Sequence, residues 1–170
     1  QAQQGLLAAA LGDACASVDA PSLHEAHGTG TALGDPIEAG SLEGAVLSKR
    51  DAATVGALAV GGVKANIGHA EPAAGMTGLL KLVVGLGGSE AAPNAQLRAL
   101  NPHLGGVRCC RVGCALPVQL SARTVLREAG GVSSFGYSGT IAHAVVASGC
   151  DESVRSKQLI FEDTTERATQ

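Results

Sequence analysis

Residues 22–47, SLHEAHGTGTALGDPIEAGSLEGAVL, decide the fold class of this 170-residue chain. Within this stretch, Ser22–His27 predicts a brief strand that leads into a loop of glycine and threonine. Asp35 then predicts an N-cap and Pro36 the first helical residue, so we expect a helix that ends near Ser48–Arg50. The order strand, loop, helix is the unit from which α/β folds are built.

The same order recurs in residues 55–87. The apolar run Val55–Val63 (VGALAVGGV) predicts a buried strand, and Lys64–His69 predicts the loop at its end. A helix is expected to begin after Glu71-Pro72 and to end at about Leu86. Because this helix is apolar almost all round, we expect it to be buried on most of its faces.

The flanking segments complete an α/β pattern. Gly5–Ala16 predicts a helix, while residues 125–137 and 140–147 predict two adjacent strands joined through a Gly/Ser turn. Strands that alternate with helices predict a layered αβα fold with a mixed, mostly parallel sheet. We expect this domain to span residues 1–149 and a polar tail to span residues 150–170.

Composition excludes several classes of protein. Hydrophobic residues make up 45% of the chain and charged residues 16%, with a net charge of −3, which excludes a disordered protein. Few aromatic residues and thinly spread cations argue against nucleic-acid binding, and the lack of a long apolar run argues against a membrane span. Five unevenly spaced cysteines argue against a secreted disulfide framework, so we expect a cytoplasmic location, with an organelle such as the plastid as the alternative.

The candidate chemistry lies in the predicted strand-end loops. His27, Lys64, His69 and the turn Gly136–Thr140 all occupy such loops, and ligands of parallel sheets bind where loops leave the strand ends. One loop histidine could simply be hydrogen-bonded within its own turn. Two histidines that direct N–H donors to one point would stabilise an oxyanion or enolate, and a nearby buried lysine would tune their protonation.

Three motifs in this chain closely resemble those of β-ketoacyl synthases, and above all those of polyketide synthase ketosynthase domains. Residues 25–38 (EAHGTGTALGDPIE) and 63–69 (VKANIGH) resemble the two histidine signatures of that family. Residues 131–143 (GVSSFGYSGTIAH) resemble its Gly-rich closing motif, and Asn101–Leu104 matches its Asn-Pro element. The resemblance covers residues 5–147.

The resemblance implies a thiolase-like fold, of which this chain would be the C-terminal half of a pseudo-duplicated pair. It implies a decarboxylating Claisen condensation of acyl and malonyl thioesters, in polyketide or fatty-acid synthesis, with phosphopantetheine presented by an acyl carrier protein and no bound cofactor. The residues that match the family's functional positions are, for catalysis, His27, His69 and Lys64 and, for substrate binding or gating, Thr29, Thr31, Phe135 and Tyr137.

The nucleophilic cysteine of such an enzyme is expected in a preceding half that this chain lacks. Cys15 lies only twelve residues before His27, on a stretch that matches a surface helix, and no neighbour in sequence would lower its pKa. We therefore expect Cys15 to be structural and the chain to need a complementary N-terminal half, an acyl carrier protein and a homodimer or larger assembly. Ile141 replaces an asparagine usual in the closing motif, so the alternative is a catalytically inactive structural or assembly subunit derived from a ketosynthase.

A cysteine cluster offers a further alternative, a zinc site. Cys109, Cys110 and Cys114 with His103 could supply four ligands. Adjacent cysteines rarely reach one tetrahedral ion, however, and no second C-x₂-C pair is present. We therefore expect no metal site.

Overall fold

A five-stranded sheet forms the centre of the molecule. The computed structural model describes residues 1–106, 113–122 and 129–147. In spatial order the strands are β4 (Cys114–Ala115), β2 (Leu58–Gly61), β1 (Pro21–Glu25), β6 (Ala129–Phe135) and β7 (Ile141–Ala147). Strand β7 runs antiparallel to β6, and the other pairs are parallel, which confirms the expected mixed, mostly parallel sheet.

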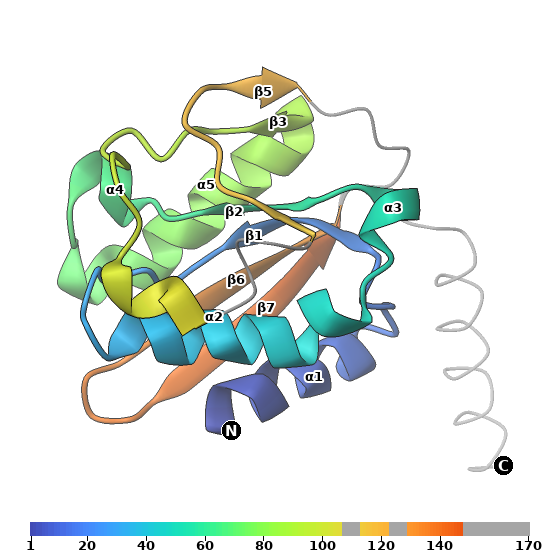
Figure 1. Cartoon of the computed structure of the whole chain (residues 1–170), viewed down its shortest axis with the longest axis horizontal. Helices are drawn as coiled ribbons and strands as arrows, with labels where there is room; N and C mark the ends of the chain where they lie inside the picture. The colour runs from blue at the N-terminus through green and yellow to red at the C-terminus, as the bar shows by residue number, and fades with distance from the viewer. Residues whose placement is uncertain (107–112, 123–128, 148–170) are drawn as a thin grey trace, which may run out of the picture.

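Helices cover both faces of this sheet. Helices α1 (Ala2–Asp13) and α2 (Gly34–Ala45) lie on one face, and α5 (Ala74–Gly88) lies on the other (Figure 1). The short elements are η1 (Leu47–Lys49), α3 (Ala52–Val55), α4 (Lys64–Ile67), η2 (Glu71–Ala73), η3 (Pro102–Gly106) and the antiparallel pair β3 (Glu90–Ala91) and β5 (Ser121–Ala122). The three layers confirm the predicted αβα arrangement.

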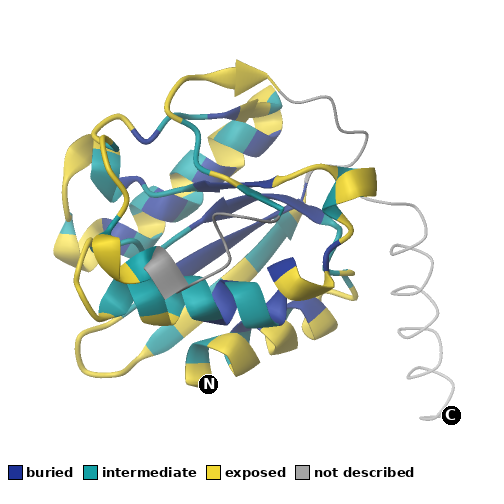
Figure 2. Ribbon diagram, in the orientation of Figure 1, coloured by how far each residue is buried: buried dark blue, intermediate teal, exposed yellow. Residues whose placement is uncertain are grey.

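The two faces of the sheet bury separate apolar cores. Successive side chains of a strand point to opposite faces, so Leu58 and Val60 of β2 pack with α1 and α2, whereas Ala59 between them packs with α5. Leu23 of β1 joins Ala59 and Leu82 of α5 in this second core. The central strands are the most deeply buried part of the molecule, as Figure 2 shows.

Two local predictions differ from the structure. Helix α2 begins at Gly34, so Leu33, which has no side-chain acceptor, occupies the N-cap position in place of the predicted Asp35. The carboxylate of Asp35 accepts the backbone N–H of Gly30. The run predicted as one strand from Val55 contributes only Leu58–Gly61 to the sheet. The residues before it form α3, and the residue after that helix, Gly56, has a positive φ of +77° that glycine adopts without strain.

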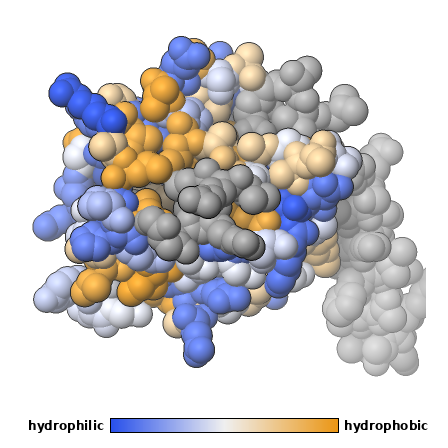
Figure 3. All heavy atoms as spheres, viewed as in Figure 1, coloured by the Kyte–Doolittle hydropathy of each residue, from blue (hydrophilic) through white to orange (hydrophobic). Residues whose placement is uncertain are grey.

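The prediction that the α5 helix is buried on most faces is wrong. Its buried side is a narrow stripe that includes Ala74, Gly78 and Leu82. On its other side Leu80 and Val84 are 57% and 74% exposed, and Met76 and Val83 are exposed as well. Figure 3 shows hydrophobic surface in the upper left of the view, the region of α5 and the segment before β5. No helix among the described residues is long and apolar enough to cross a membrane.

Some predictions fall on residues that the structure does not describe. Cys109 and Cys110 lie outside the described residues, as does the whole of the predicted tail, residues 150–170. Of the cysteine cluster, only Cys114 is described, half-buried in β4.

A stacked pair of histidines, of which His24 is buried and His143 half-buried, spans three strands of the sheet. The rings of His24 in β1 and His143 in β7 stack with centroids 5.6 Å apart and planes 20° apart. Between them lies β6, where a Cβ on Gly131 would come within 2.8 Å of the His143 ring. The Ser133 hydroxyl lies 3.0 Å from Nδ1 of His143, whereas Nε2 of His24 has no hydrogen-bond partner among the described residues.

Both histidines are therefore held neutral. Burial, followed by the charge on His143, lowers the pKa of His24 to about 3, and burial lowers the pKa of His143 to about 4. In the unfolded chain both groups titrate near pH 6.5. As the pH falls below 6.5, the unfolded chain gains protons that the folded chain does not take up, so the free energy of unfolding decreases.

We predict that His24→Phe makes the stability of the protein less sensitive to acid. Between pH 5.5 and 4.5, its unfolding free energy should change with pH by about 1 kcal/mol per unit less than that of the wild type. Urea unfolding at a series of pH values measures this slope. The same substitution at the exposed His103 should leave the slope unchanged, and an unaltered slope in His24→Phe would show that His24 titrates normally.

Candidate active site

The first histidine loop is held by a half-buried carboxylate. His27 follows the carboxyl end of β1, and its backbone N–H and that of Gly28 donate to the two oxygens of Glu38 in α2, at 2.7 and 2.8 Å. Gly28 and Gly30 both adopt positive φ angles, +52° and +74°, so the loop can turn tightly over the start of α2. The chain thereby fixes the backbone on both sides of the imidazole.

The imidazole of His27 has a defined tautomer. Its Nδ1 accepts the backbone N–H of Phe135 at 3.3 Å, and the ammonium of Lys64 lies 3.5 Å from the same nitrogen. Lys64 also donates to the backbone carbonyl of His27. Because Nδ1 acts as an acceptor, this hydrogen-bond network assigns the ring proton to Nε2. The Phe135 ring packs against the imidazole with centroids 5.4 Å apart.

The second histidine has the same tautomer. His69 follows α4 and Gly68, whose φ is +79°. Its Nδ1 accepts the backbone N–H of Glu71 at 2.9 Å, which again leaves the ring proton on Nε2. The two imidazoles meet edge to face, with centroids 6.0 Å apart and planes at 86°. The structure thus brings the predicted residues His27, Lys64 and His69 together at one edge of the sheet.

The electrostatics of this cluster keep His27 neutral. Burial first, then the charge of Lys64 and that of His69, lower the pKa of His27 to about 4. Burial lowers the pKa of Lys64, an effect that the charges of Glu38 and Glu25 oppose. Burial also raises the pKa of Glu38, against the opposing effects of its two backbone hydrogen bonds and of Lys64. At neutral pH, a neutral imidazole that carries a proton on Nε2 can donate a hydrogen bond to a developing oxyanion.

The predicted substrate-binding hydroxyls have internal contacts. Thr29 and Thr31 lie with their hydroxyl oxygens 3.3 Å apart, and Thr31 accepts the backbone N–H of Gly34 at 3.0 Å. Tyr137 projects fully into solvent from the turn between β6 and β7. The structure therefore places Phe135 against His27 but leaves Tyr137 apart from the histidines, and the substrate roles of these four residues stay predictions.

The sequence predicted no role in the site for the residues that hold the first histidine loop, and it predicted Asp35 only as an N-cap. Glu38 fixes the backbone of the His27 loop, and Asp35 links that loop to Asn101. The amide nitrogen of Asn101 donates to the carbonyl of Thr31 at 3.1 Å and to Asp35 at 3.0 Å. The sequence did contain a signal for these roles: Asp35 and Glu38 lie in the first two turns of the helix that directly follows the histidine loop, where carboxylates can accept the backbone N–H groups of that loop.

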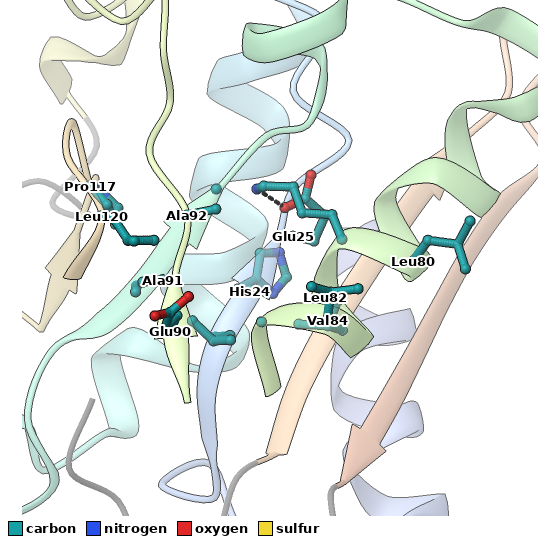
Figure 4. A pocket seen from close by; sticks show the side chains of 15 residues that line it. His24, Glu25, Leu80, Leu82, Val84, Glu90, Ala91, Ala92, Pro117 and Leu120 are labelled. Carbon is teal, nitrogen blue, oxygen red and sulfur yellow. Dashed lines mark hydrogen bonds and ion pairs between the residues drawn. The ribbon is translucent and has the colours of Figure 1, made fainter. Parts of the chain in front are cut away.

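A hollow adjoins the cluster. It has a volume of about 550 Å³, and residues of the first histidine loop, including Thr29, line it together with Lys64, His69 and Leu100. A second hollow of about 300 Å³ lies beside α5, with Leu80 and Val84 on its wall (Figure 4). The first one offers space for a substrate beside the imidazoles.

Cys15 lies at the other end of β1 from the histidines. Cys15 precedes the strand, whereas His27 follows it. The strand itself has five residues and is about 16 Å long. The thiol is exposed, in a backbone conformation with φ +49°. This placement supports the prediction that Cys15 does not act with the histidine cluster.

Comparison with known proteins identifies the family. The family model described as "Beta-ketoacyl synthase, C-terminal domain" matches residues 1–98. The chain is 43% identical over 152 residues to the highly reducing polyketide synthase cm3B of Cordyceps militaris, covering 89% of this chain and 6% of that protein. It is 41% identical over 152 residues to the spectinabilin polyketide synthase system protein NorA' of Streptomyces orinoci, covering 85% of this chain and 4% of that protein.

Solved structures agree. The oxazolomycin ketosynthase domain OzmH KS7 of Streptomyces albus superimposes with a TM-score of 0.77 and 35% identity over 88% of this chain. The ketosynthase from module 6 of the bacillaene synthase of Bacillus subtilis 168 gives a TM-score of 0.77 and 30% identity, also over 88%. The chain covers 26% and 27% of those two structures. The protein belongs to the β-ketoacyl synthase family, as a C-terminal ketosynthase domain of the polyketide synthase type with a thiolase-like fold.

Proposed function

We propose that this chain supplies the histidines and the lysine of a decarboxylating condensation between acyl and malonyl thioesters. The observation that carries the proposal is the common tautomer of His27 and His69. Each ring has its Nδ1 occupied by a backbone N–H, so two Nε2–H donors remain within one small site. Paired donors of this kind stabilise the negative charge that develops on a thioester oxygen.

The proposed reaction needs that stabilisation at one step. The bond between the malonyl carboxylate and its neighbouring carbon breaks, CO₂ leaves, and the electron pair becomes an enolate whose oxygen carries the charge. Hydrogen bonds from His27 and His69 strengthen as this charge forms. The enolate carbon then attacks the carbonyl of an acyl chain held as a thioester on a cysteine, whose sulfur leaves with the electron pair of the broken C–S bond.

Lys64 acts on the histidine rather than on the substrate in this proposal. Burial is the larger cause of the lowered pKa of His27, and the charge of Lys64 adds to it, so the ring stays neutral and its Nδ1 can accept hydrogen bonds. A protonated His27 would lose its hydrogen bond from Phe135. The site therefore functions with a cation beside a neutral imidazole.

The hollow beside the cluster supports a thioester on a long flexible carrier. Thr29 lines this hollow, and the Thr31 hydroxyl lies 3.3 Å from that of Thr29, so both hydroxyls can donate to the amide carbonyls of a phosphopantetheine arm. We propose that an acyl carrier protein presents this arm. A bound organic cofactor has no role in the proposed chemistry.

The exposed face of α5 supports a large apolar partner. Met76, Leu80, Val83 and Val84 recur at helical spacing and leave a hydrophobic stripe on the surface. Solved ketosynthases contain about three quarters of their chain beyond the part matched here. We propose that a complementary half, which carries the nucleophilic cysteine, covers this stripe, and that the resulting domain forms a homodimer or larger assembly.

Substitution of His69 tests the chemistry. With the chain co-expressed with the cysteine-bearing half of a related ketosynthase, His69→Ala should slow CO₂ release from a malonyl thioester by at least about a hundredfold, because one oxyanion donor is lost. Release of labelled CO₂ measures the rate. Lys49→Ala, a change in η1 beyond the far end of α2, should leave it unchanged. An unaltered rate in His69→Ala removes His69 from the site and favours a purely structural role for the chain.

The chain without a partner should form no acyl-enzyme. After incubation of the purified chain with an acyl thioester, intact-mass measurement should show no stoichiometric adduct on Cys15. That thiol is remote from both histidines, so neither ring can act on it. A full adduct that depends on His27 would place the nucleophile in this chain and overturn the proposed need for a second half.

Charge on the exposed stripe should weaken association selectively. The double variant Leu80→Glu/Val84→Glu should reduce affinity for the cysteine-bearing half by at least about tenfold, since two carboxylates would have to be desolvated. Calorimetric titration measures the affinity. Ala8→Glu/Ala9→Glu places the same charges on the exposed side of α1, across the sheet, and should have no effect. Equal affinities for both variants would contradict the proposed interface.

A further inference from the structure

A second carboxylate, that of Glu25, lies buried two residues before His27. Glu25 is the last residue of β1, and its side chain is 4% exposed on the face that α5 covers. One carboxylate oxygen pairs with the ammonium of Lys81 at 2.5 Å, and the other accepts the backbone N–H of Val63. Figure 4 shows the pair, drawn with a dashed line, at the wall of the hollow beside α5.

The fold leaves room for this pair through two glycines. A Cβ on Gly61 of β2 would come within 2.5 Å of the Lys81 nitrogen and 3.2 Å of a Glu25 oxygen. A Cβ on Gly78 of α5 would come within 3.3 Å of the Glu25 Cγ. Both elements therefore approach closely enough to enclose the charges, and any larger residue at Gly61 would displace the ammonium.

Stability alone is a weak reason for such a pair. Two buried charges lose hydration, and their mutual attraction often only offsets that cost, so apolar residues of similar volume serve stability as well or better. The hydrogen bond to Val63 adds something that apolar side chains lack. It connects the end of β1 to the residue that precedes α4.

Glu25 connects two segments of backbone, each of which leads directly into a residue of the site. His27 follows Glu25 by two residues, and Lys64 follows Val63 directly. Between them, the N–H of Ala26 donates to the carbonyl of Gly61 at 2.7 Å. Resting on the proposed function, we propose that the Glu25–Lys81 pair is a positioning device that fixes Lys64 against His27 through Val63.

The charge of Glu25, like its hydrogen bond with Val63, favours the contact between Lys64 and His27. After Glu38, Glu25 is the second group that raises the pKa of Lys64 against the effect of burial. It therefore helps to keep Lys64 an ammonium, the state in which Lys64 donates to His27 and lowers the pKa of that ring. Glu25 contacts no substrate in this arrangement and is a positioning residue only.

Nuclear magnetic resonance of the chain without substrate tests the proposal. Glu25→Gln should lower the pKa of Lys64 by about half a unit or more. It should also accelerate hydrogen exchange of the Val63 amide by at least about tenfold and shift the ring-nitrogen signals of His27. The control is Glu90→Gln, because Glu90 is an exposed carboxylate on the wall of the same hollow, and this change should alter none of the three signals.

The double variant Glu25→Met/Lys81→Met separates positioning from stability. It removes both charges together, so neither the carboxylate nor the ammonium is left without its partner, and the variant should fold. The rapid Val63 exchange and the shifted His27 signals should nevertheless persist. If a folded double variant shows wild-type exchange and wild-type His27 signals, the pair is only structural and the proposal fails.

These readouts do not depend on the condensing activity. A His69→Ala variant that keeps its rate would refute the proposed chemistry and leave the positioning measurement intact. Unchanged Lys64 and His27 signals in the Glu25 variants would refute the positioning role while the chemistry stood.

Discussion

Parallel pairing of β1 with its two neighbours is the constraint on which the site depends. Glu25 lies opposite Gly61 of β2 on one side and Val132 of β6 on the other. Because all three strands leave the sheet at the same edge, the loops that follow them meet there. His27, Lys64 and Phe135 come from these three strand ends, and the residues are separated by up to 108 positions in the sequence. A shift of one residue in either ladder would turn the flanking side chains to the opposite face.

Buried and half-buried polar side chains convert that shared edge into a fixed geometry. Glu38 satisfies two backbone donors of the His27 loop, and Glu25 satisfies the N–H of Val63. Asn94 accepts from the N–H of Gly62 at 2.8 Å and donates to the carbonyls of Val60 and Pro117. Each such group, left unpaired in the interior, would cost about 1–3 kcal/mol. The backbone N–H groups of the loops therefore stay paired with these side chains, because breaking the hydrogen bonds would leave buried polar atoms unpaired. This explains how a segment rich in glycine presents its histidines in one orientation.

The α5 helix connects this site to an exposed apolar surface. One side packs its small residues and Leu82 against the sheet, and Lys81 reaches the carboxylate of Glu25. The other side exposes leucine and valine, although the helix is apolar almost throughout. The sequence shows that both faces of the helix are apolar, but it does not show what covers each face. The apolar pattern therefore predicted burial for the whole helix. In the proposed function, a complementary half would cover this exposed face.

The sequence by itself determined the alternation of strands and helices, the strand-end placement of His27, Lys64 and His69, and the family resemblance. Those features are local, because a glycine loop, a Pro at a helix start and an apolar run each act through the backbone of their own neighbours. Only the tertiary structure decided what surrounds the histidines: the donors to their Nδ1 atoms, the Glu38 and Glu25 carboxylates, and the neutral pair of His24 and His143. These contacts join residues between 2 and 119 positions apart, and nearly all exist only after the strands pair. Protonation, tautomer and charge depend on burial and on partners brought from elsewhere in the chain, so the packed sheet alone could set them.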